Sequence, residues 1–427
     1  MRLLRRAGSR YIAFGDTRPS ALLAMTKKYG EIRKMSSKNY DVIIVGGGVM
    51  GCATAYYLLK FDSTLKVAII EKDPTYEFAS TPLSDGNMRI QFNIKENIQM
   101  SQYGMEVMKT FADEFEVDGV KPDAAFRQQG NLFVLDEHSK DESYEGYLLQ
   151  KSLGCDVEWL TPEEVGKYYP LYNLKDCVAG TFGPKDGTMS PMGVLNGYKK
   201  KVIQLGAEYI HAEVNQVLKE GNQIVGVKLS DGEMLHSKIV MNAAGAWAKH
   251  IAERVGASIP VEPTKRQVTI VEANVHPQKV LPALFLPSGL YVIHEGEGMF
   301  MIGKCFADDY VGTDDFVWER KMFEERMWQE LVEYLPAFDR LKISRGWAGL
   351  YEVNTLDSNA ILGELPALKG FYLANGFSGH GFQQCHAVGR YIAELMLNKT
   401  PTLDLSIFSP RRIVENAPVF ESRRKII

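Results

Sequence analysis

The sequence predicts an α/β fold in which a parallel sheet, built from both ends of the chain, is interleaved with a smaller mixed or antiparallel sheet. Three observations predict it. A glycine-rich turn joins two apolar strands within residues 42–70, a second glycine-rich turn follows an apolar strand near residue 376, and strand-like segments fill much of the chain between them. No linker separates two halves of the 427 residues, so we expect one discontinuous domain folded around another.

The first turn has the spacing G-x-G-x-x-G, formed by Gly46, Gly48 and Gly51 between a β-branched strand and a helical segment. A second strand then ends in Glu71. The three glycines permit a tight turn, a close approach to a pyrophosphate and close packing of the helix, and the acid accepts hydrogen bonds from a ribose. The eighteen uncharged residues at 42–59 could span a membrane. Their glycines favour the strand–turn–helix unit, so the sequence predicts dinucleotide binding.

The amino-terminal segment differs in charge from the rest of the chain. Residues 1–38 carry ten Lys and Arg residues and only two acidic ones, whereas the whole chain has a formal net charge of −4. Arg2, Arg6 and Arg10 share one face of a helix, with apolar residues on the other side. Such a segment is typical of a mitochondrial presequence, and the alternative is a solvated tail without a targeting role. We expect the presequence.

Cysteine and charge patterns exclude several classes of protein. The five cysteines are scattered and form no C-x-x-C pair, so the sequence offers no metal site and fits a reducing compartment. No basic stripe indicates nucleic-acid binding, and we expect no transmembrane span.

Periodicity and capping residues predict the remaining elements. Helices are expected at residues 95–116, from Thr161 onward, and at 191–205, 319–335 and 382–397. Strands are expected at 130–135, around 177–183, in a hairpin pair with turns near 220–222 and 230–232, at 239–242, in several pieces of 264–305, and at 370–374. The stretch 79–92 is rich in turn formers and contains the basic residue Arg89.

The second glycine turn narrows the choice of cofactor. Gly376, Gly379 and Gly381 lie between a buried strand and a helix, so a second helix N-terminus is directed at a ligand. A nicotinamide cofactor needs only one such unit at its pyrophosphate. A reduced flavin carries negative charge on its ring, and a helix N-terminus placed there stabilises it. The two turns together favour a flavin over NAD.

Three motifs carry a resemblance to a known family. The GGGVMG turn with Glu71, NAAGAW at 242–247 and NGFSGHGFQQ at 375–384 resemble the D-amino-acid oxidase/sarcosine oxidase family of FAD enzymes over about residues 39–410. The resemblance implies a Rossmann-like FAD-binding domain and an interleaved substrate domain with a mixed sheet over the flavin. It also implies oxidation of a C–N bond, in which a hydride passes from the carbon beside an amine to the flavin and water hydrolyses the imine. That step needs positioning and a neutral amine more than a side-chain base.

The resemblance also implies domain boundaries and site residues. After a presequence at 1–38, the FAD domain is expected to comprise 39–93, 185–260 and 345–427, and the substrate or cap domain 94–184 and 261–344. The residues expected to act on a substrate are Arg89, Tyr351 and His380. Those expected to bind FAD are Gly46, Gly48, Val49, Met50, Gly51, Glu71, Lys72, Asn87, Arg89, Val214, Ala244, Gly245, Trp247, Gly349, Ser378, Gly379, His380, Gly381, Phe382 and Gln383.

The chain departs from the sarcosine oxidases at several positions. Phe92 and Gln383 stand where those enzymes carry the arginine and lysine that bind the substrate carboxylate. Gly349 replaces the cysteine that links the flavin, and no histidine in 76–93 could replace it, so FAD is expected to bind non-covalently. The lysine credited with activating oxygen falls near Met301, with Lys304 nearby. A buried substrate carboxylate without a cation would be costly, so we do not expect a simple N-methylglycine oxidase.

Two roles remain open. Residues 261–268, 347–363 and the carboxyl-terminal Ile-Ile most resemble a mitochondrial member of the family that assists assembly of respiratory complex I. The resemblance implies complex I subunits or assembly intermediates as partners, and a location in the matrix or peripherally on the inner membrane. The FAD would then serve mainly to keep a binding surface folded. The alternative is a stand-alone dehydrogenase or oxidase for a small amine, similar to sarcosine or dimethylglycine.

Overall fold

The first β-α-β unit has the predicted order of strand, glycine turn, helix and strand. The structure is a computed structural model, and it describes residues 38–421. The predicted presequence therefore lies outside the described residues, apart from Lys38. Residues 38–421 belong to one compact unit, and the division of this unit into an FAD domain and a cap domain stays a prediction.

A six-stranded sheet contains the glycine turns. Its strand order is β19-β20-β13-β2-β3-β9, and all neighbours are parallel except the edge pair β19 and β20. The strands are β2 (Val42–Val45), β3 (Val67–Glu71), β9 (Glu208–His211), β13 (Val240–Asn242), β19 (Ile361–Glu364) and β20 (Phe371–Asn375). Because β2, β3, β13 and β20 run in the same direction, their carboxyl ends meet at one edge of the sheet. Both glycine turns leave from this edge.

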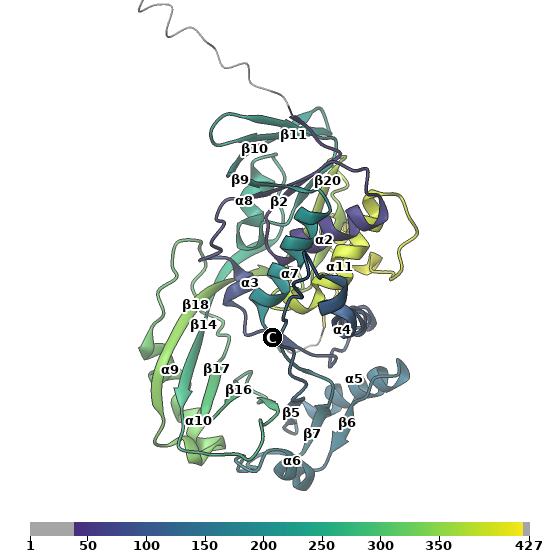
Figure 1. Cartoon of the computed structure of the whole chain (residues 1–427). Helices are drawn as coiled ribbons and strands as arrows, with labels where there is room; N and C mark the ends of the chain where they lie inside the picture. Colours follow the sequence, from purple (N-terminus) through teal and green to yellow (C-terminus); the bar gives the residue numbers. More distant parts are fainter. Residues whose placement is uncertain (1–37, 422–427) are drawn as a thin grey trace, which may run out of the picture. The chain divides into compact units, whose positions relative to one another are not determined.

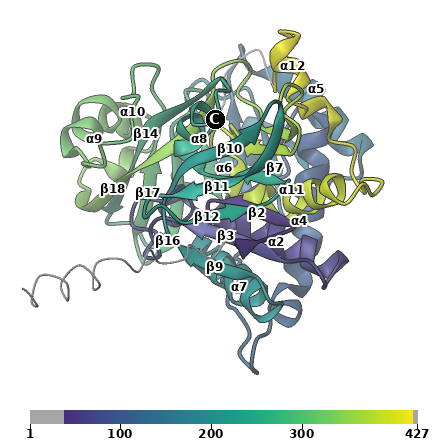
Figure 2. The same cartoon turned by 90° about the horizontal axis from the view of Figure 1, so that it is seen from above.

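Helices cover one face of this sheet. They are α2 (Val49–Phe61), α4 (Lys95–Glu114), α7 (Pro191–Gln204) and α11 (Gly381–Met396). Within β2, Val42 and Ile44 pack with these helices, whereas Ile43 and Val45 pack on the other face. The alternation explains why every residue of the strand is buried and apolar. In both views, α2, α4 and α11 lie together (Figure 1, Figure 2).

A four-stranded sheet and a short helix cover the other face. The sheet has the order β1-β12-β11-β10, and its hairpin turns fall where the sequence predicts them. The elements are β1 (Lys38–Asn39), β10 (Val214–Glu220), β11 (Gln223–Leu229), β12 (Met234–His236) and α8 (Ala248–Glu253). Val217, Val227 and Leu235 from these strands share a core with Ile43 and Ile70.

An eight-stranded mixed sheet forms the second half of the fold. Its order is β18-β14-β17-β16-β15-β5-β7-β6, and only β15 and β5 pair in parallel. The strands are β5 (Asn131–Leu135), β6 (Glu158–Leu160), β7 (Ala179–Gly183), β14 (Val261–Glu272), β15 (Ala283–Phe285), β16 (Tyr291–Gly296), β17 (Met299–Gly303) and β18 (Lys342–Asn354). The two long strands β14 and β18 reach toward α3 (Ser80–Leu83) (Figure 1).

The remaining elements are short. They are the strand pair β4 (Asn87–Met88) and β8 (Gly187–Thr188), the helices α5 (Lys140–Ser152), α6 (Pro162–Tyr168), α9 (Arg320–Arg326), α10 (Trp328–Tyr334) and α12 (Arg411–Val414), and the 3-10 turns Gly245–Trp247, Pro336–Phe338 and Ser406–Phe408. Thr161 caps α6 through a capping box with Glu164, as its sequence predicts.

One helix that the sequence predicts as continuous is divided in the structure. The segment expected as a single helix at 319–335 is interrupted at Met327, whose φ of −120° is not helical. Met327 is 1% exposed and shares a core with Phe323 and Leu331, so the interruption allows all three side chains to be buried. Among residues 38–421, no helix is both long and apolar enough to cross a membrane.

Candidate functional site

The first glycine turn forms the floor of the site. Gly46 has a φ of +107°, and a Cβ atom there would lie 2.2 Å from the carbonyl oxygen of Ala243 in the neighbouring strand end. Only glycine fits this position. The next amide, of Gly47, donates to Oε2 of Glu71 at 2.8 Å, and Oε1 of the same carboxylate accepts from the amide of Asp73 at 2.9 Å. The acid at the end of β3 is thereby fixed beside the turn.

Gly48 and Gly51 have different neighbours. A Cβ atom at Gly51 would lie 2.0 Å from the carbonyl oxygen of Gly46, so this glycine lets α2 pack on the turn. A Cβ atom at Gly48 would have a single neighbour within 4 Å, Oγ1 of Thr81 at 3.4 Å, and would otherwise point into open space. That space lies at the N-terminus of α2, where the first N–H groups have no partner within the helix. The geometry fits an anionic group, as the sequence predicts.

The second glycine turn joins β20 to α11. Gly376, Ser378 and Gly379 all have positive φ, and a Cβ atom at Gly379 would lie 2.6 Å from the ring of Tyr351. The turn is bound to β18 by several hydrogen bonds. The amide of Gly376 donates to Oε2 of Glu352 at 3.1 Å, and the amide of Asn354 donates to Oγ of Ser378 at 3.0 Å. The second helix N-terminus is thus held beside the eight-stranded sheet.

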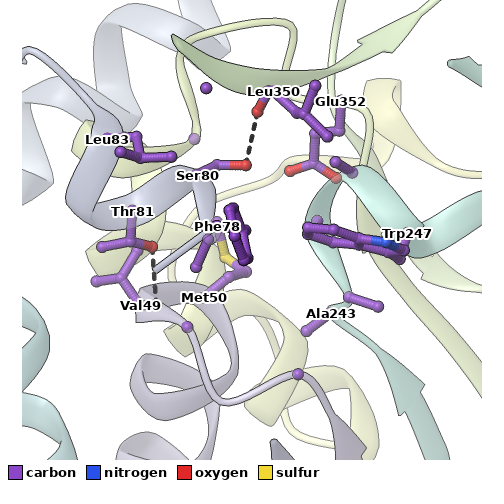
Figure 3. A pocket seen from close by; sticks show the side chains of 18 of the residues that line it. Val49, Met50, Phe78, Ser80, Thr81, Leu83, Ala243, Trp247, Leu350 and Glu352 are labelled. Atoms are coloured by element: carbon purple, nitrogen blue, oxygen red, sulfur yellow. Dashed lines mark hydrogen bonds between the residues drawn. The ribbon is translucent and has the colours of Figure 1, made fainter. Parts of the chain in front are cut away.

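Both turns open into one cavity of about 240 Å³. Its lining also includes α3, the 3-10 turn Gly245–Trp247 and parts of β14, β16 and β18. Hydrogen bonds fasten α3 to β18, because Oγ of Ser80 donates to the carbonyl of Leu350 at 2.7 Å and Nε1 of Trp347 donates to the carbonyl of Leu83 at 2.9 Å. Figure 3 shows Ser80 and Leu350 joined in this way at one wall.

Aromatic side chains border the cavity. Phe78 and Trp247 line it, and Phe316, from the loop before α9, lies 4.5 Å from the ring of Phe78 and 6.4 Å from that of Trp247. Nζ of Lys72 lies over the Trp247 ring at 3.4 Å. These rings provide flat apolar surface for a planar ligand.

Two carboxyl groups in the wall have altered acidity. Burial raises the pKa of Glu352 to about 8, and its carboxylate points into the cavity above Trp247 (Figure 3). Burial also raises the pKa of Asp85, whose carboxylate accepts a hydrogen bond from the amide of Asn87 at 3.0 Å. At neutral pH the Glu352 side chain is therefore largely protonated.

The structure brings most of the expected residues to this cavity. Those that line it are Gly46, Gly48, Val49, Met50, Glu71, Lys72, Val214, Ala244, Gly245, Trp247, Gly349, Tyr351, Gly379, Gly381 and Phe382. Six others lie behind the lining, namely Gly51, Asn87, Arg89, Ser378, His380 and Gln383. The functional assignment of every one of these residues stays a prediction.

Three of the residues behind the lining contact one another at the start of α11. The guanidinium of Arg89 lies 3.1 Å from Nε2 of His380 and 4.6 Å from the ring centroid of Phe92. The backbone amide of Arg89 donates to Oε1 of Gln383 at 2.7 Å. Arg89 is 7% exposed and Phe92 is 2% exposed. Asn87 instead exchanges side-chain hydrogen bonds with Asn131 of β5.

Sequence reasoning missed several lining residues. They are Phe78, Ser80, Thr81, Leu83 and Asp85 in and around α3, Arg266 and Val268 in β14, Tyr291 in β16, and Glu352 in β18. The stretch around α3 was expected only as a loop, although its position after Glu71 could have indicated a contact with the same ligand. Lys304, considered for a role with oxygen, is outside the lining and pairs with Glu330 at 2.6 Å.

Comparison with known proteins agrees with this architecture. Residues 41–395 match the model of the family described as FAD dependent oxidoreductase. The chain belongs to this family. FAD-dependent oxidoreductase domain-containing protein 1 of Xenopus laevis is 33% identical over 418 residues, which cover 89% of this chain and 84% of that protein. Sarcosine oxidase subunit beta of an Arthrobacter species is 28% identical over 381 residues, covering 84% and 88% of the two chains.

A solved structure supports the family assignment. L-proline dehydrogenase from P. horikoshii is 28% identical in sequence and has a TM-score of 0.80, with 90% of this chain and 100% of that chain covered. The expected α/β fold with a Rossmann-like FAD-binding part and a mixed sheet is therefore confirmed. The chain is an FAD-dependent oxidoreductase.

The residues of the cavity fit FAD. The open space beside Gly48 suits the pyrophosphate, the Glu71 carboxylate beside Gly47 suits the ribose, and the second glycine turn presents a helix N-terminus to the ring. Gly349 has no thiol that could form a covalent bond to the flavin. A Cβ atom at this position would lie only 2.9 Å from Cβ of Leu83, so a side chain would be crowded there.

We expect the FAD to be bound without a covalent bond. Neither Gly349 nor any residue of 76–93 offers a cysteine or histidine to form the link. Denaturation of the purified protein with acid should release all of the flavin, measured as yellow absorbance in the supernatant. Flavin absorbance that stays with the precipitated chain would refute this expectation.

Proposed function

We propose that this FAD-dependent oxidoreductase oxidises a carbon–nitrogen bond of an amine, and that it acts in mitochondria in support of complex I assembly. The observation that carries the chemistry is a single cavity that joins the glycine turn at Gly48 to the wall formed by β14, β16 and β18. A ligand bound at the turn can therefore meet a substrate at the wall. Bound FAD would supply the hydride acceptor, and the residues of the wall would orient the substrate.

The names of the relatives support amine chemistry. Sarcosine oxidase and L-proline dehydrogenase are named for amines that carry a carboxylate. The presequence expected at 1–38 and the resemblance of 261–268 and 347–363 to a mitochondrial assembly factor support the cellular role. The proposed location is the matrix, with peripheral contact to the inner membrane, and the proposed partners are complex I subunits or assembly intermediates.

Sarcosine should be a poor reductant of this flavoprotein. Phe92 provides no cation for its carboxylate, and Gln383 is already bonded to the backbone of Arg89. A hydrogen bond to a charged group contributes about 1.5–3 kcal/mol, so loss of two should weaken binding by orders of magnitude. The rate of flavin reduction under anaerobic conditions by millimolar sarcosine measures this. Rapid reduction would overturn the reasoning from these two positions.

Complementation can separate a structural role of FAD from a catalytic one. Tyr351→Phe removes only a hydroxyl group from the cavity wall and should retain FAD, whereas Gly48→Ala should lose it. Each variant would be supplied to cells that lack the native protein, and the amount of assembled complex I measured. If FAD mainly supports the fold, Tyr351→Phe restores assembly and Gly48→Ala does not. We favour this outcome because both carboxylate-binding positions of the family have changed.

Two other results are informative. If amine oxidation is required for assembly, a Tyr351→Phe protein that has lost flavin reduction by amines fails as well, although it accumulates with FAD bound. Full restoration by a Gly48→Ala protein shown to be free of FAD would contradict both versions of the proposal. A protein that oxidises amines but leaves complex I unaffected in its absence would favour the alternative, a stand-alone amine dehydrogenase or oxidase.

A further inference from the structure

The wall formed by the eight-stranded sheet carries a group of polar side chains that sequence comparison with the sarcosine oxidases did not indicate. Asp85, Arg266, Tyr291 and Tyr351 all line the cavity, and we call them the polar end. They come from the segment after α3 and from β14, β16 and β18. Their charges decide which substrates the cavity can accept.

The positive charge of the polar end is already neutralised. Nη1 of Arg266 lies 2.5 Å from Oδ2 of Asp309, a side chain that is 8% exposed. The same carboxylate oxygen accepts from the amide of Phe306 at 2.8 Å, so the pair is held in place. Nη1 of Arg266 also donates to the carbonyl of Lys265 at 3.2 Å. A substrate carboxylate would have to compete with Asp309 for this guanidinium.

The second arginine of this region is engaged as well. Arg89 lies behind the lining, and its guanidinium contacts His380 and the face of Phe92. The neighbouring Gln383 uses its side-chain oxygen to accept the amide of Arg89. Arg266 and Arg89 therefore both have partners within the protein.

Asp85 contributes the negative charge of the polar end. One carboxylate oxygen accepts the amide of Asn87, and the side chain as a whole lines the cavity. Tyr291 and Tyr351 line the same cavity as Asp85; burial raises the pKa of both tyrosines, and the negative charge of Asp85 raises it further. The rings of Tyr291 and Tyr351 add aromatic surface beside the carboxylate. A carboxylate that lines a cavity together with aromatic rings is a favourable site for an organic cation.

We propose that the polar end selects a substrate that binds as an organic cation, namely a secondary or tertiary amine with no carboxylate beside the reacting nitrogen. This inference rests on the proposed oxidation of a C–N bond and names its substrate class. Asp85 would accept the ammonium proton and pass it to water, bound FAD would supply the acceptor for the hydride from the carbon beside nitrogen, and water would complete cleavage of the C–N bond. Overall, a substituted ammonium ion, FAD and water give the dealkylated ammonium ion, an aldehyde and FADH₂.

Three probes of matched shape test the inference on the FAD-loaded full chain. N-Methylisobutylamine is a cation, sarcosine has a carboxylate in place of its isopropyl group, and N-methylisobutyramide is a neutral amide with the same branched skeleton. Binding is followed by the change in the flavin absorption spectrum during titration without oxygen, and reduction by bleaching of the same band. We expect the amine to bind at least tenfold more tightly than either of the other probes. Equal or tighter binding of sarcosine would overturn the inference.

A charge-removing variant provides an independent test. Asp85→Asn should keep FAD, with an unchanged flavin-to-protein ratio, and should bind N-methylisobutylamine at least tenfold more weakly than the wild type. Asp339→Asn, which removes a carboxylate from an exposed position, is the matched control and should bind the amine as the wild type does. An unchanged dissociation constant in an FAD-loaded Asp85→Asn protein would refute the role of this residue. If that variant does not hold FAD, the comparison of the three probes on the wild type decides whether the inference is correct.

The readouts distinguish this inference from the proposed function. Binding of the amine cation without any reduction of the flavin would support the inference and count against C–N oxidation. Reduction by sarcosine, with no binding of the amine, would support C–N oxidation and refute the inference.

Discussion

Gly48→Ala and Gly51→Val are both expected to prevent FAD binding, but only Gly51→Val should also destabilise the protein without its cofactor. Comparison of these two variants separates ligand binding by the turn from its packing within the protein. Gly51 contacts protein, since a Cβ atom there would lie 2.0 Å from the carbonyl oxygen of Gly46 and 3.1 Å from Cγ2 of Ile44. Gly48 faces the cavity, where an added methyl group meets almost no protein atoms.

The expected magnitudes follow from these contacts. Overpacking at a tight contact costs about 1–3 kcal/mol of folding free energy, and the branched valine at Gly51 should reach at least that range. The methyl group at Gly48 is compatible with its φ of −67°, so the apoprotein should fold normally. It should nevertheless not bind FAD, because the methyl group occupies the approach of the pyrophosphate. A ligand at a thousandfold excess over Kd adds about 4 kcal/mol of stability, which both variants should lose.

Two measurements on each variant are sufficient. The flavin-to-protein ratio after purification reports binding, and thermal unfolding of each apoprotein reports the fold. A Gly48→Ala protein that retains FAD at the wild-type ratio would contradict the assignment of the pyrophosphate to this turn. An apoprotein of Gly51→Val as stable as that of the wild type would contradict the packing role of Gly51.

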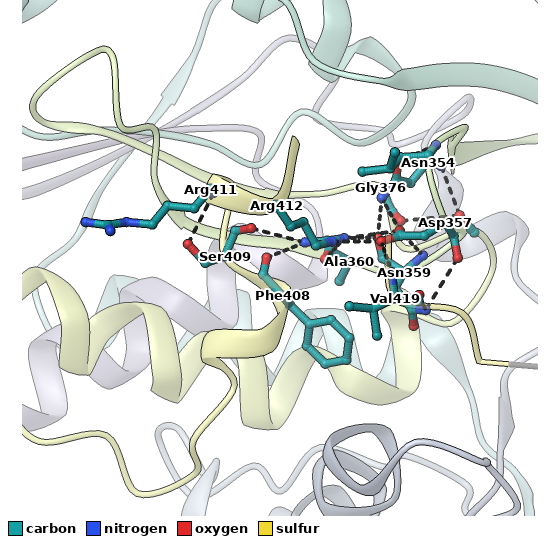
Figure 4. A network of polar contacts seen from close by, with 12 residues as sticks. Asn354, Asp357, Asn359, Ala360, Gly376, Phe408, Ser409, Arg411, Arg412 and Val419 are labelled. Carbon is teal, nitrogen blue, oxygen red and sulfur yellow. Dashed lines mark hydrogen bonds and ion pairs between the residues drawn. The ribbon is translucent and has the colours of Figure 1, made fainter. Parts of the chain in front are cut away.

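Arg412→Ala is expected to produce the largest loss of stability among single changes away from the cavity. The guanidinium of Arg412 binds the carboxylate of Asp357 through Nε at 2.8 Å, and the two side chains are 5% and 0% exposed. The same guanidinium donates to the carbonyls of Phe408, Asn359 and Ala360. Figure 4 shows this network between the carboxyl-terminal segment and the turn that follows β18.

Removal of the guanidinium would leave several buried groups without partners. Loss of one member of a buried ion pair costs about 3–5 kcal/mol, mainly because the remaining charge is unpaired. The turn also supports the site, since the side chain of Asn354 donates to Asp357 at 2.8 Å while its backbone amide binds Ser378 of the second glycine turn. The variant should therefore bind FAD more weakly as well as unfold more readily.

The neighbouring arginine provides the control. Arg411 is exposed and points away from the network in Figure 4, and its backbone amide donates to Oγ of Ser409 at 3.3 Å. Arg411→Ala should change the free energy of unfolding by no more than about 0.5 kcal/mol. Denaturant unfolding of both variants measures the difference. Equal stability of Arg412→Ala and Arg411→Ala would show that the buried network contributes little.

The parts of the site that the sequence predicts are those whose chemistry is local. Gly46, Gly48 and Gly51 occur at a fixed spacing between a strand and a helix; the structure shows a steric reason for Gly46 and Gly51, and open space beside Gly48. The second turn is predictable for the same reason. In both cases the ligand-binding groups are backbone atoms of consecutive residues, so a short stretch of sequence contains the information.

The polar end could not be predicted in this way. Arg266 and Tyr351 lie 85 positions apart in the chain and meet the cavity because β14 and β18 pair over their whole length. No local pattern in either strand indicates that register. Asp85 falls in a stretch expected only as a loop, and its closeness to Tyr291 depends on packing between α3 and the large sheet. The interruption at Met327 has a similar origin, since burial of its side chain overrides a continuous helical pattern.

Arg89 and His380 illustrate a partial success. The sequence places both near the flavin, and the structure brings their side chains within 3.1 Å of each other at the start of α11. It also places them behind the lining of the cavity rather than in it. The sequence predicts that Arg89 and His380 lie close together, whereas the directions of these two side chains depend on the positions of Phe92 and Gln383.

The most direct test of the account is reduction of the bound flavin by amines in the absence of oxygen. The purified FAD-loaded chain would be mixed with a panel of secondary and tertiary amines and of amino acids, and the flavin absorption followed with time. We expect at least one amine without a carboxylate to bleach the flavin band and to yield an aldehyde in equimolar amount. A flavin that every amine leaves oxidised, although dithionite reduces it, would contradict the proposal that this cavity oxidises a C–N bond.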